Sequence, residues 1–188
     1  MTKLVVIDPG HGGHDPGATG NGLRECDVTL KIAKRVKTAL LRDFDVHVKL
    51  TRSSDVFVGL DERAKFANDR GAAYFVAVHI NSGGGSGYED YVHTSASAKS
   101  RQRRATLHRE VATFMKGHGM HDRGLKQANF AVLRETEMPA ILTENLFIDT
   151  AGDARRLKDD GFLKGLAEAH ARGIAAALSL PRSLTPVA

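Results

Sequence analysis

The stretch Ala73–Ile80, with the sequence AYFVAVHI, is a near-continuous apolar run that decides how the chain folds. A strand without polar alternation is buried on both faces, which is typical of the interior of a parallel sheet covered by helices. The run is bounded by Gly71 on one side and by Ser82–Gly87, with the sequence SGGGSG, on the other. Both flanks favour loops. We therefore predict a central strand in an α/β sheet.

Further strands are predicted on both sides of this run from β-branched or alternating apolar residues. They cover Lys3–Ile7, Val46–Leu50, Tyr88–His93, Phe130–Leu133 and Ala140–Thr143. Helical periodicity predicts helices over Asp27–Leu41, Leu60–Asp69, Ala96–Gly117, Ala151–Leu157 and Phe162–Leu180. Strands that alternate with helices indicate a single α/β domain. We expect a twisted, mostly parallel sheet of about six strands with helices on both faces.

The predicted domain covers residues 1–180, and residues 181–188 have the composition of a linker. Hydrophobic residues make up 41% and charged residues 26% of the chain, which is ordinary for a globular protein. With 188 residues, the chain is long enough to bury a sizeable core. No apolar run approaches the length of a membrane span. We expect a monomer.

The net charge of +5 favours polyanionic partners, among them nucleic acid and anionic wall polymers. The basic segment Lys99–Arg109 is expected to be a solvated helix face. No aromatic residue interleaves with it, which weakens the case for stacking on nucleic-acid bases. The start, MTKLVVIDPGHGG, has the pattern of a first strand and not of a signal peptide. We therefore expect synthesis in the cytoplasm without a secretion signal.

Ionisable side chains follow several predicted strands, at the edge where open α/β sheets carry their active sites. His11 follows the first strand, and His79 lies near the end of the central strand. Glu25 lies at the start of the first long helix. Two imidazoles and one carboxylate are a common ligand set for catalytic zinc. A further carboxylate is then needed to take the proton of the attacking water, and Glu144 is the candidate.

Each of these residues also has an ordinary explanation when it is taken singly. A histidine in a loop or at a strand end is commonly solvated or hydrogen-bonded, and Glu25 suits the first turn of a helix. Glu144 is harder to explain in this way, because it ends an apolar run where a charge is costly. No short local motif such as His-Glu-x-x-His joins these residues, so spacing alone leaves the metal site open.

Four blocks of sequence carry a more specific signal. They are Val5–Glu25, Leu50–Asn68, Phe75–His93 and Arg123–Asp149. In order and spacing these blocks resemble the zinc-dependent N-acetylmuramoyl-L-alanine amidases of the amidase_3 type. The likeness is especially close to sporulation autolysins that lyse the mother cell and to phage endolysins. It implies hydrolysis of peptidoglycan at the amide bond between the lactyl group of N-acetylmuramic acid and L-alanine of the stem peptide.

The resemblance also implies roles for single residues. The family's zinc ligands fall on His11, Glu25 and His79, so the implied cofactor is Zn²⁺. The catalytic glutamate falls on Glu144, in the motif Leu-Thr-Glu-Asn. The motif at the second histidine is His-Ile-Asn, where the family usually has His-Ala-Asn, and this change should not affect the metal. The resemblance places no ligand on His14.

Three further residues of the matched region, Asn81, Arg123 and Asn129, are predicted to line the substrate groove. Asp8 either orients an imidazole or only starts the Asp-Pro-Gly turn. Cys26, the single cysteine, is expected to be a small buried residue and not a thiol nucleophile. The glycine-rich loop after the central strand either closes over a stem peptide or is a long hairpin loop.

Two alternatives to an amidase remain open. One is a metallopeptidase that cuts between amino acids of the stem peptide. The other is a basic module that binds nucleic acid without catalysis, which would need no metal. For an amidase, two settings are open: a phage endolysin released by a holin, or an autolysin that reaches the cell wall when the mother cell lyses.

Overall fold

A six-stranded sheet forms the middle of this computed structural model, which describes residues 2–183. In spatial order its strands are β4 (His47–Leu50), β1 (Leu4–Pro9), β5 (Tyr74–Asn81), β8 (Ala140–Phe147), β6 (Tyr88–Val92) and β7 (Asp122–Gln127). Every neighbouring pair is parallel except β8 and β6, which are antiparallel. The predicted α/β domain with a mostly parallel sheet is therefore confirmed.

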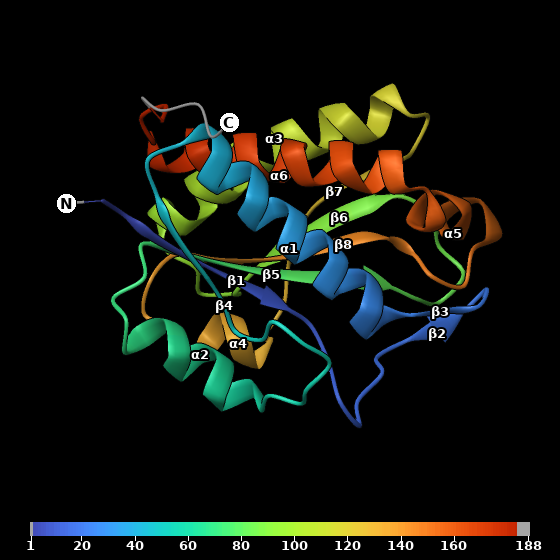
Figure 1. Cartoon of the computed structure of the whole chain (residues 1–188), viewed down its shortest axis with the longest axis horizontal. Helices are drawn as coiled ribbons and strands as arrows, with labels where there is room; N and C mark the ends of the chain where they lie inside the picture. The colour runs from blue at the N-terminus through green and yellow to red at the C-terminus, as the bar shows by residue number, and fades with distance from the viewer. Residues whose placement is uncertain (1, 184–188) are drawn as a thin grey trace.

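Helices cover both faces of the sheet (Figure 1). One face carries α1 (Glu25–Asp43), α3 (Ala98–Gly117) and α6 (Asp160–Leu178), which form the larger apolar core with the sheet. The other face carries α2 (Leu60–Asn68) and α4 (Ala131–Arg134) over a smaller core. A short hairpin of β2 (Thr19–Gly20) and β3 (Leu23–Arg24) leads into α1, and α5 (Ala151–Lys158) precedes α6.

The central strand β5 is apolar on both faces, as its sequence predicts. Its residues alternate between the two cores: the larger core takes Tyr74, Val76, Val78 and Ile80, and the smaller core takes Phe75 and Ala77. Because β5 lies in parallel between β1 and β8, the carboxyl ends of these three strands meet at one edge of the sheet. That edge carries the candidate site.

One predicted strand is wrong and another strand was missed. Phe130–Leu133, predicted as a strand, is the start of the short helix α4, whose first turn is closed by the Phe130 carbonyl accepting from the backbone N–H of Arg134. The sixth strand is instead β7, whose half-exposed sequence DRGLKQ has no apolar alternation. An edge strand of this kind is held mainly by its backbone pairing with β6, which the side-chain pattern does not reveal.

The glycine-rich loop Ser82–Gly87 is not a hairpin, because β8 lies between β5 and β6. The backbone N–H groups of Gly83 and Gly84 both donate to Asp149 Oδ2 at 2.8 Å. The end of the loop donates to the buried carboxylate of Asp153. These bonds tie the loop to the segment that connects β8 to α5. The loop is therefore held in place and is not a free lid.

Residues 181–183 pair with the segment between α1 and β4. The backbone N–H of Asp45 donates to the Pro181 carbonyl at 3.0 Å, and Phe44 forms an isolated β-bridge with Arg182. The rest of the predicted linker, residues 184–188, lies outside the described residues. Among the described residues, no helix combines the length and the apolar character needed to cross a membrane.

The basic segment of α3 is only partly a solvated face. Arg104 is buried and donates from Nη1 to the Lys126 carbonyl at 2.7 Å. His108 Nδ1 lies 2.7 Å from Asp90 Oδ2 under the same helix. The expectation of a solvated face is therefore wrong for these two residues, which fix α3 to β6 and β7.

The two long helices α3 and α6 cross closely at Gly173. A Cβ atom at this position would lie 2.9 Å from Leu107 Cα and 3.1 Å from the Leu107 carbonyl oxygen. Both atoms belong to the backbone of α3, so neither can move aside cheaply. The helix crossing therefore requires glycine inside α6.

We predict that Gly173→Ala lowers the free energy of unfolding by about 1–2 kcal/mol, because overpacking outweighs the gain of about 1 kcal/mol in helix propensity. Chemical denaturation measures the change. The matched control is Gly117→Ala at the end of α3, where nothing lies within 4 Å of the added atom. This control should leave stability unchanged or raise it by up to about 1 kcal/mol. Equal effects of the two changes would contradict the packing argument.

Candidate metal centre

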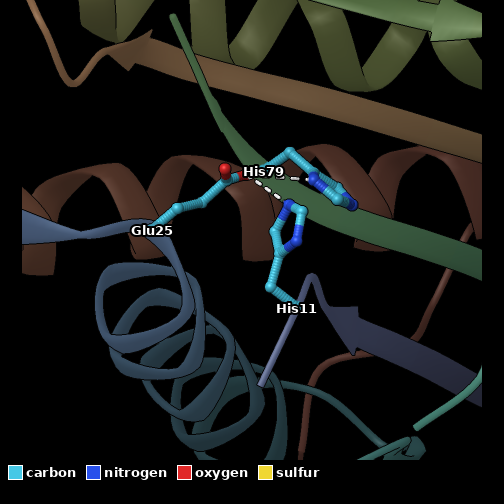
Figure 2. A group of neighbouring side chains, drawn as sticks. All are labelled: His11, Glu25 and His79. Atoms are coloured by element: carbon cyan, nitrogen blue, oxygen red, sulfur yellow. Dashed lines mark hydrogen bonds and ion pairs between the residues drawn. The ribbon is translucent and has the colours of Figure 1, made fainter. Parts of the chain in front are cut away.

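The three predicted ligands come together at the carboxyl edge of the sheet (Figure 2). His11 lies in the loop after β1, His79 near the end of β5, and Glu25 is the first residue of α1. Their ligand atoms all lie within 4.8 Å of one another. The chain thus gathers residues that are 14 and 54 positions apart in sequence into one cluster of two imidazoles and a carboxylate.

Glu25 is the centre of this cluster. Its Oε1 lies 3.2 Å from His11 Nε2 and 3.0 Å from His79 Nδ1. The same oxygen accepts the backbone N–H of Ile80 at 3.0 Å, and Oε2 accepts that of Ala18 at 2.9 Å. A tetrahedral zinc site with bonds of about 2.1 Å would hold its ligands roughly 3.4 Å apart, so the donor set fits such an ion.

Asp15 holds the ring of His11. Its Oδ2 lies 2.8 Å from His11 Nδ1, which leaves Nε2 for a metal. A carboxylate on the far nitrogen of a ligand histidine is a usual feature of metal sites, because it sets the tautomer and the ring orientation. The alternative that Asp8 orients an imidazole is wrong: the Asp8 carboxylate accepts from Arg63 and Thr51 instead.

Two glycines make room for the histidine rings. A Cβ on Gly10 would lie 2.4 Å from the ring of His79. A Cβ on Gly17, whose φ is +66°, would lie 2.7 Å both from the ring of His11 and from Glu25 Oε2. His11 itself has a φ of 61°, a strained conformation for a residue with a side chain. Surrounding contacts must therefore hold this loop in place.

Two buried arginines supply these contacts. Arg52 donates to the carbonyls of Pro9 and Gly10, at 3.0 and 2.8 Å. Arg63 donates to the carbonyls of Pro9 and His11, at 2.7 and 2.8 Å. Each arginine residue is only 3% exposed, so these charge-assisted bonds are sheltered from water. The backbone that presents His11 is thereby fixed from the side of β4 and α2.

Electrostatics tie the cluster together when no metal is bound. Burial lowers the pKa of His11, but hydrogen bonds and charges from Glu25 and Asp15 outweigh this effect and raise the pKa to about 9. Burial opposes the ionised form of Glu25, yet the two histidines hold its pKa well below the ordinary range. Glu25 therefore stays an anion at neutral pH, as a metal ligand must.

Glu144 lies beside the cluster. It is the direct neighbour of His79 in the pairing of β5 with β8, and of Glu89 in the pairing of β8 with β6. Its Oε2 is buried and has no hydrogen-bond partner among residues 2–183. Burial raises the pKa of Glu144 to about 7, with the charges of Glu25 and Glu89 adding to the rise and His79 opposing it. Such a group can exchange a proton near neutral pH.

Two of the three predicted groove residues contact Glu89. Glu89 itself was not among the residues predicted from the sequence. Asn81 Nδ2 donates to Glu89 Oε1 at 2.9 Å, and Arg123 Nε donates to Oε2 at 2.8 Å. Asn129 makes neither contact: its Oδ1 accepts from Arg134 Nη1 at 2.9 Å. A buried glutamate in the alternating strand YEDYV could have been noticed, but its partners lie on other strands.

A cavity of about 460 Å³ opens next to the cluster on the face of α2 and α4. Glu144, His11 and His79 line its floor. Its walls are mainly apolar and include the exposed side chains of Phe57, Leu60 and Phe130. An extended substrate therefore has room beside the candidate metal ligands.

The remaining candidates take no part in the cluster. His14 is exposed and its ring stacks on Phe57 at 4.1 Å between centroids. Cys26 is buried in the first turn of α1, as expected, and burial raises the pKa of its thiol. Cys26 also lies near Asp27 and Asp55, but Arg24 already pairs with both carboxylates. This second group is accounted for by ion pairs.

We predict that Asp15→Ala weakens metal affinity by about 10- to 100-fold, because His11 loses the partner that orients its ring. Competition with a coloured chelator measures the affinity. His14→Ala, a change in the same loop, is the control and should leave the affinity unchanged. A loss of affinity in the His14 variant that matches the loss in the Asp15 variant would show that the wrong histidine has been assigned.

Without metal, stability should depend on the charge of His11. Its pKa is raised from 6.5 to about 9, so its contribution is complete below pH 6.5 and is lost as the pH rises through about 9. We predict that the free energy of unfolding, measured in the presence of a chelator, falls over this interval. His11→Gln should flatten this dependence. An unchanged slope in that variant would contradict the assignment.

Residues 5–176 match the Amidase_3 family, described as N-acetylmuramoyl-L-alanine amidase. The chain is 51% identical over 185 residues to the endolysin of Bacillus phage SPP1, a match that covers 97% of this chain and 68% of the endolysin. It is 47% identical over 180 residues to the sporulation-specific N-acetylmuramoyl-L-alanine amidase of Bacillus subtilis strain 168, covering 95% and 69% of the two.

Solved structures agree with these matches. The catalytic domain of CwlV, an N-acetylmuramoyl-L-alanine amidase from Bacillus (Paenibacillus) polymyxa var. colistinus, matches with a TM-score of 0.90 and 35% identity, covering 96% of this chain and 100% of that domain. The N-acetylmuramoyl-L-alanine amidase from Clostridium difficile 630 matches with a TM-score of 0.90 and 32% identity, covering 95% and 97%. The resemblance inferred from the four sequence blocks is confirmed.

Proposed function

Because this chain belongs to the Amidase_3 family of N-acetylmuramoyl-L-alanine amidases, we propose that it degrades peptidoglycan by hydrolysing one particular amide bond. The bond joins the lactyl group of N-acetylmuramic acid to L-alanine of the stem peptide. The observation that carries the proposal is the cluster of His11, Glu25 and His79 beside Glu144, whose Oε2 has no hydrogen-bond partner within the described part of the chain.

The proposed cofactor is zinc, held by His11, Glu25 and His79. Two neutral imidazoles and a carboxylate leave a further coordination position for water or substrate. A zinc ion bound there supplies a Lewis acid for the scissile carbonyl and lowers the pKa of water. The ion would replace the protons that link Glu25 to the two histidines in its absence, so binding should release protons.

Glu144 is the proposed proton carrier. It projects from β8 on the same face of the sheet as His79, and it lines the floor of the cavity. As a carboxylate it accepts a proton from the attacking water. It then returns this proton to the nitrogen of L-alanine, which leaves as a free amine. In the metal-free protein burial raises its pKa to about 7, so this carboxyl group can both take up and release a proton near neutral pH.

The biological setting is proposed from the relatives, which include a phage endolysin and a sporulation-specific amidase. We propose that the chain acts at the cell wall, after holin-dependent release or mother-cell lysis. Peptidoglycan is its proposed partner. Anionic wall polymers are further candidates because of the positive net charge of +5. A monomeric state stays a prediction.

Digestion of purified peptidoglycan, followed by mass analysis of the fragments, tests the proposed bond. An amidase releases stem peptides with free L-alanine amino ends and leaves glycan without peptide. A metallopeptidase would leave peptide attached to muramic acid, and that result would contradict the proposal. A chelator should abolish digestion and added zinc should restore it. A module that only binds nucleic acid would release no fragments.

We predict that Glu144→Gln lowers the rate of wall digestion by about 100- to 10,000-fold, because it removes the proton carrier. Bound zinc, measured on the purified variant, should remain at the level of the unchanged protein. His79→Ala should instead lose both zinc and activity. Near-normal digestion by the Glu144 variant would show that another group carries the proton.

A further inference from the structure

One row of residues crosses the sheet from the metal cluster to β7. His79 pairs with Glu144, Glu144 with Glu89, and Glu89 with Gly124. Neighbouring strands are about 4.8 Å apart, so the row spans three strand spacings, or about 14 Å. A substrate chain that leaves the cluster along this row would pass over β8 and β6 and then reach β7.

A β-bulge at the end of this row changes the direction of one side chain. Tyr88 pairs with Asp122, but the next residue, Glu89, pairs with Gly124. Arg123 is therefore the extra residue of the bulge, and Gly124 follows it with a φ of +82°. Bulges of this kind commonly re-aim a side chain next to a site. Here the bulge brings the Arg123 guanidinium to Glu89, on the face that carries Glu144.

The guanidinium of Arg123 is held in place but only partly used. Nε donates to Glu89 Oε2 at 2.8 Å, and the group lies 4.9 Å from the ring centre of Phe147. Glu89 is fixed in turn by Asn81 and by the hydroxyl of Tyr91. Among the described residues, neither Nη1 nor Nη2 of Arg123 has a hydrogen-bond partner. The side chain is 35% exposed, and neither Nη atom is among the buried polar atoms without a partner, so both donors are accessible to a ligand.

The cavity on the other side of the cluster offers no comparable group among residues 2–183. The cavity walls there are mainly apolar, with Phe57, Leu60 and Phe130 exposed. The cation that lines this cavity, Arg63, spends its donors on Asp8 and on backbone carbonyls. Among the described residues that line this cavity, a negatively charged part of the substrate therefore finds no free cationic donor, whereas Arg123 on β7 offers two.

On the basis of the function proposed above, we infer that Arg123 binds a carboxylate of the stem peptide, with the peptide lying across β8 and β6 and the muramoyl group in the apolar cavity. The second stem residue is a glutamate linked through its γ-carboxyl group, which leaves its α-carboxylate free. This carboxylate lies about two residue lengths, or roughly 7 Å, from the scissile amide. The long Arg123 side chain covers the remaining distance, and its two Nη donors suit a bidentate carboxylate.

The test uses two muramoyl tripeptides that differ only in whether the α-carboxyl group of the second residue is free or amidated. The unchanged protein should cleave the free acid with a kcat/KM about 10-fold higher, as expected for loss of a charge-assisted bond. Arg123→Gln should remove this preference by lowering kcat/KM for the acid and leaving the amide little changed. Arg123→Lys, which keeps the charge without the fork, should retain part of the preference.

Lys34→Gln is the matched control, because it removes the same charge from an exposed position on α1, on the opposite face of the sheet. It should keep the preference for the acid. An equal loss on both tripeptides in the Arg123→Gln variant would indicate a merely structural role and would overturn the inference. Equal cleavage of both by the unchanged protein would also overturn it, while leaving the proposed function intact. Cleavage of neither at the lactyl amide would refute the proposed function and this inference together.

Discussion

The buried carboxylate of Glu25 is the interaction on which the rest of the site depends. One of its oxygens meets nitrogens from the β1 loop, from the side chain of β5 and from the backbone at the end of β5. A carboxylate that is only 5% exposed on its side chain would be costly without such partners. These partners come from the β1 loop and from β5, and Glu25 itself begins α1, so the loop, the strand and the helix must all dock before the charge is satisfied. The cluster is therefore a constraint on folding as well as a binding site.

The loop that carries His11 shows how this constraint is met. Its backbone follows an unfavourable path, since His11 has a φ of 61°, and it packs against both histidine rings through glycine. Arg52 and Arg63 hold its carbonyls from two other elements. In the sequence, the two arginines lie far from the residues that they support. Their role is to keep the strained loop in a single conformation, so that the ligand nitrogens are already in place when a metal arrives.

Much of the fold could be predicted from the sequence, because long segments with a clear apolar period have one favourable arrangement. The central strand and the long helices are of this kind. Phe130–Leu133 could not be assigned correctly, since four apolar residues fit either a strand or a helix turn. β7 was missed because its side chains show no apolar alternation, while the strand is defined by its backbone pairing with β6. The order of the strands in the sheet, with β8 between β5 and β6, also cannot be predicted from any local sequence pattern.

The candidate site, like the fold, could be predicted only in part from the sequence. Spacing alone left each ligand open, and the family resemblance selected His11, Glu25 and His79, which the structure then brings together. The support of the site was not foreseen. Asp15 was passed over for Asp8, although a carboxylate four residues after a histidine can reach its ring only if the loop turns back. Glu89 drew no notice because its partners come from three separate places in the chain.

The pairing of residues 181–183 with the segment before β4 determines which way the domain faces when it is attached to a surface or to a carrier protein. This pairing lies at the amino ends of β1 and β4, whereas the metal cluster lies at the carboxyl ends of β1 and β5. A strand of six residues separates the two edges by about 20 Å. A surface or a fused carrier attached at residue 183 would therefore hold the domain at the edge opposite the metal cluster, with the cluster turned outward.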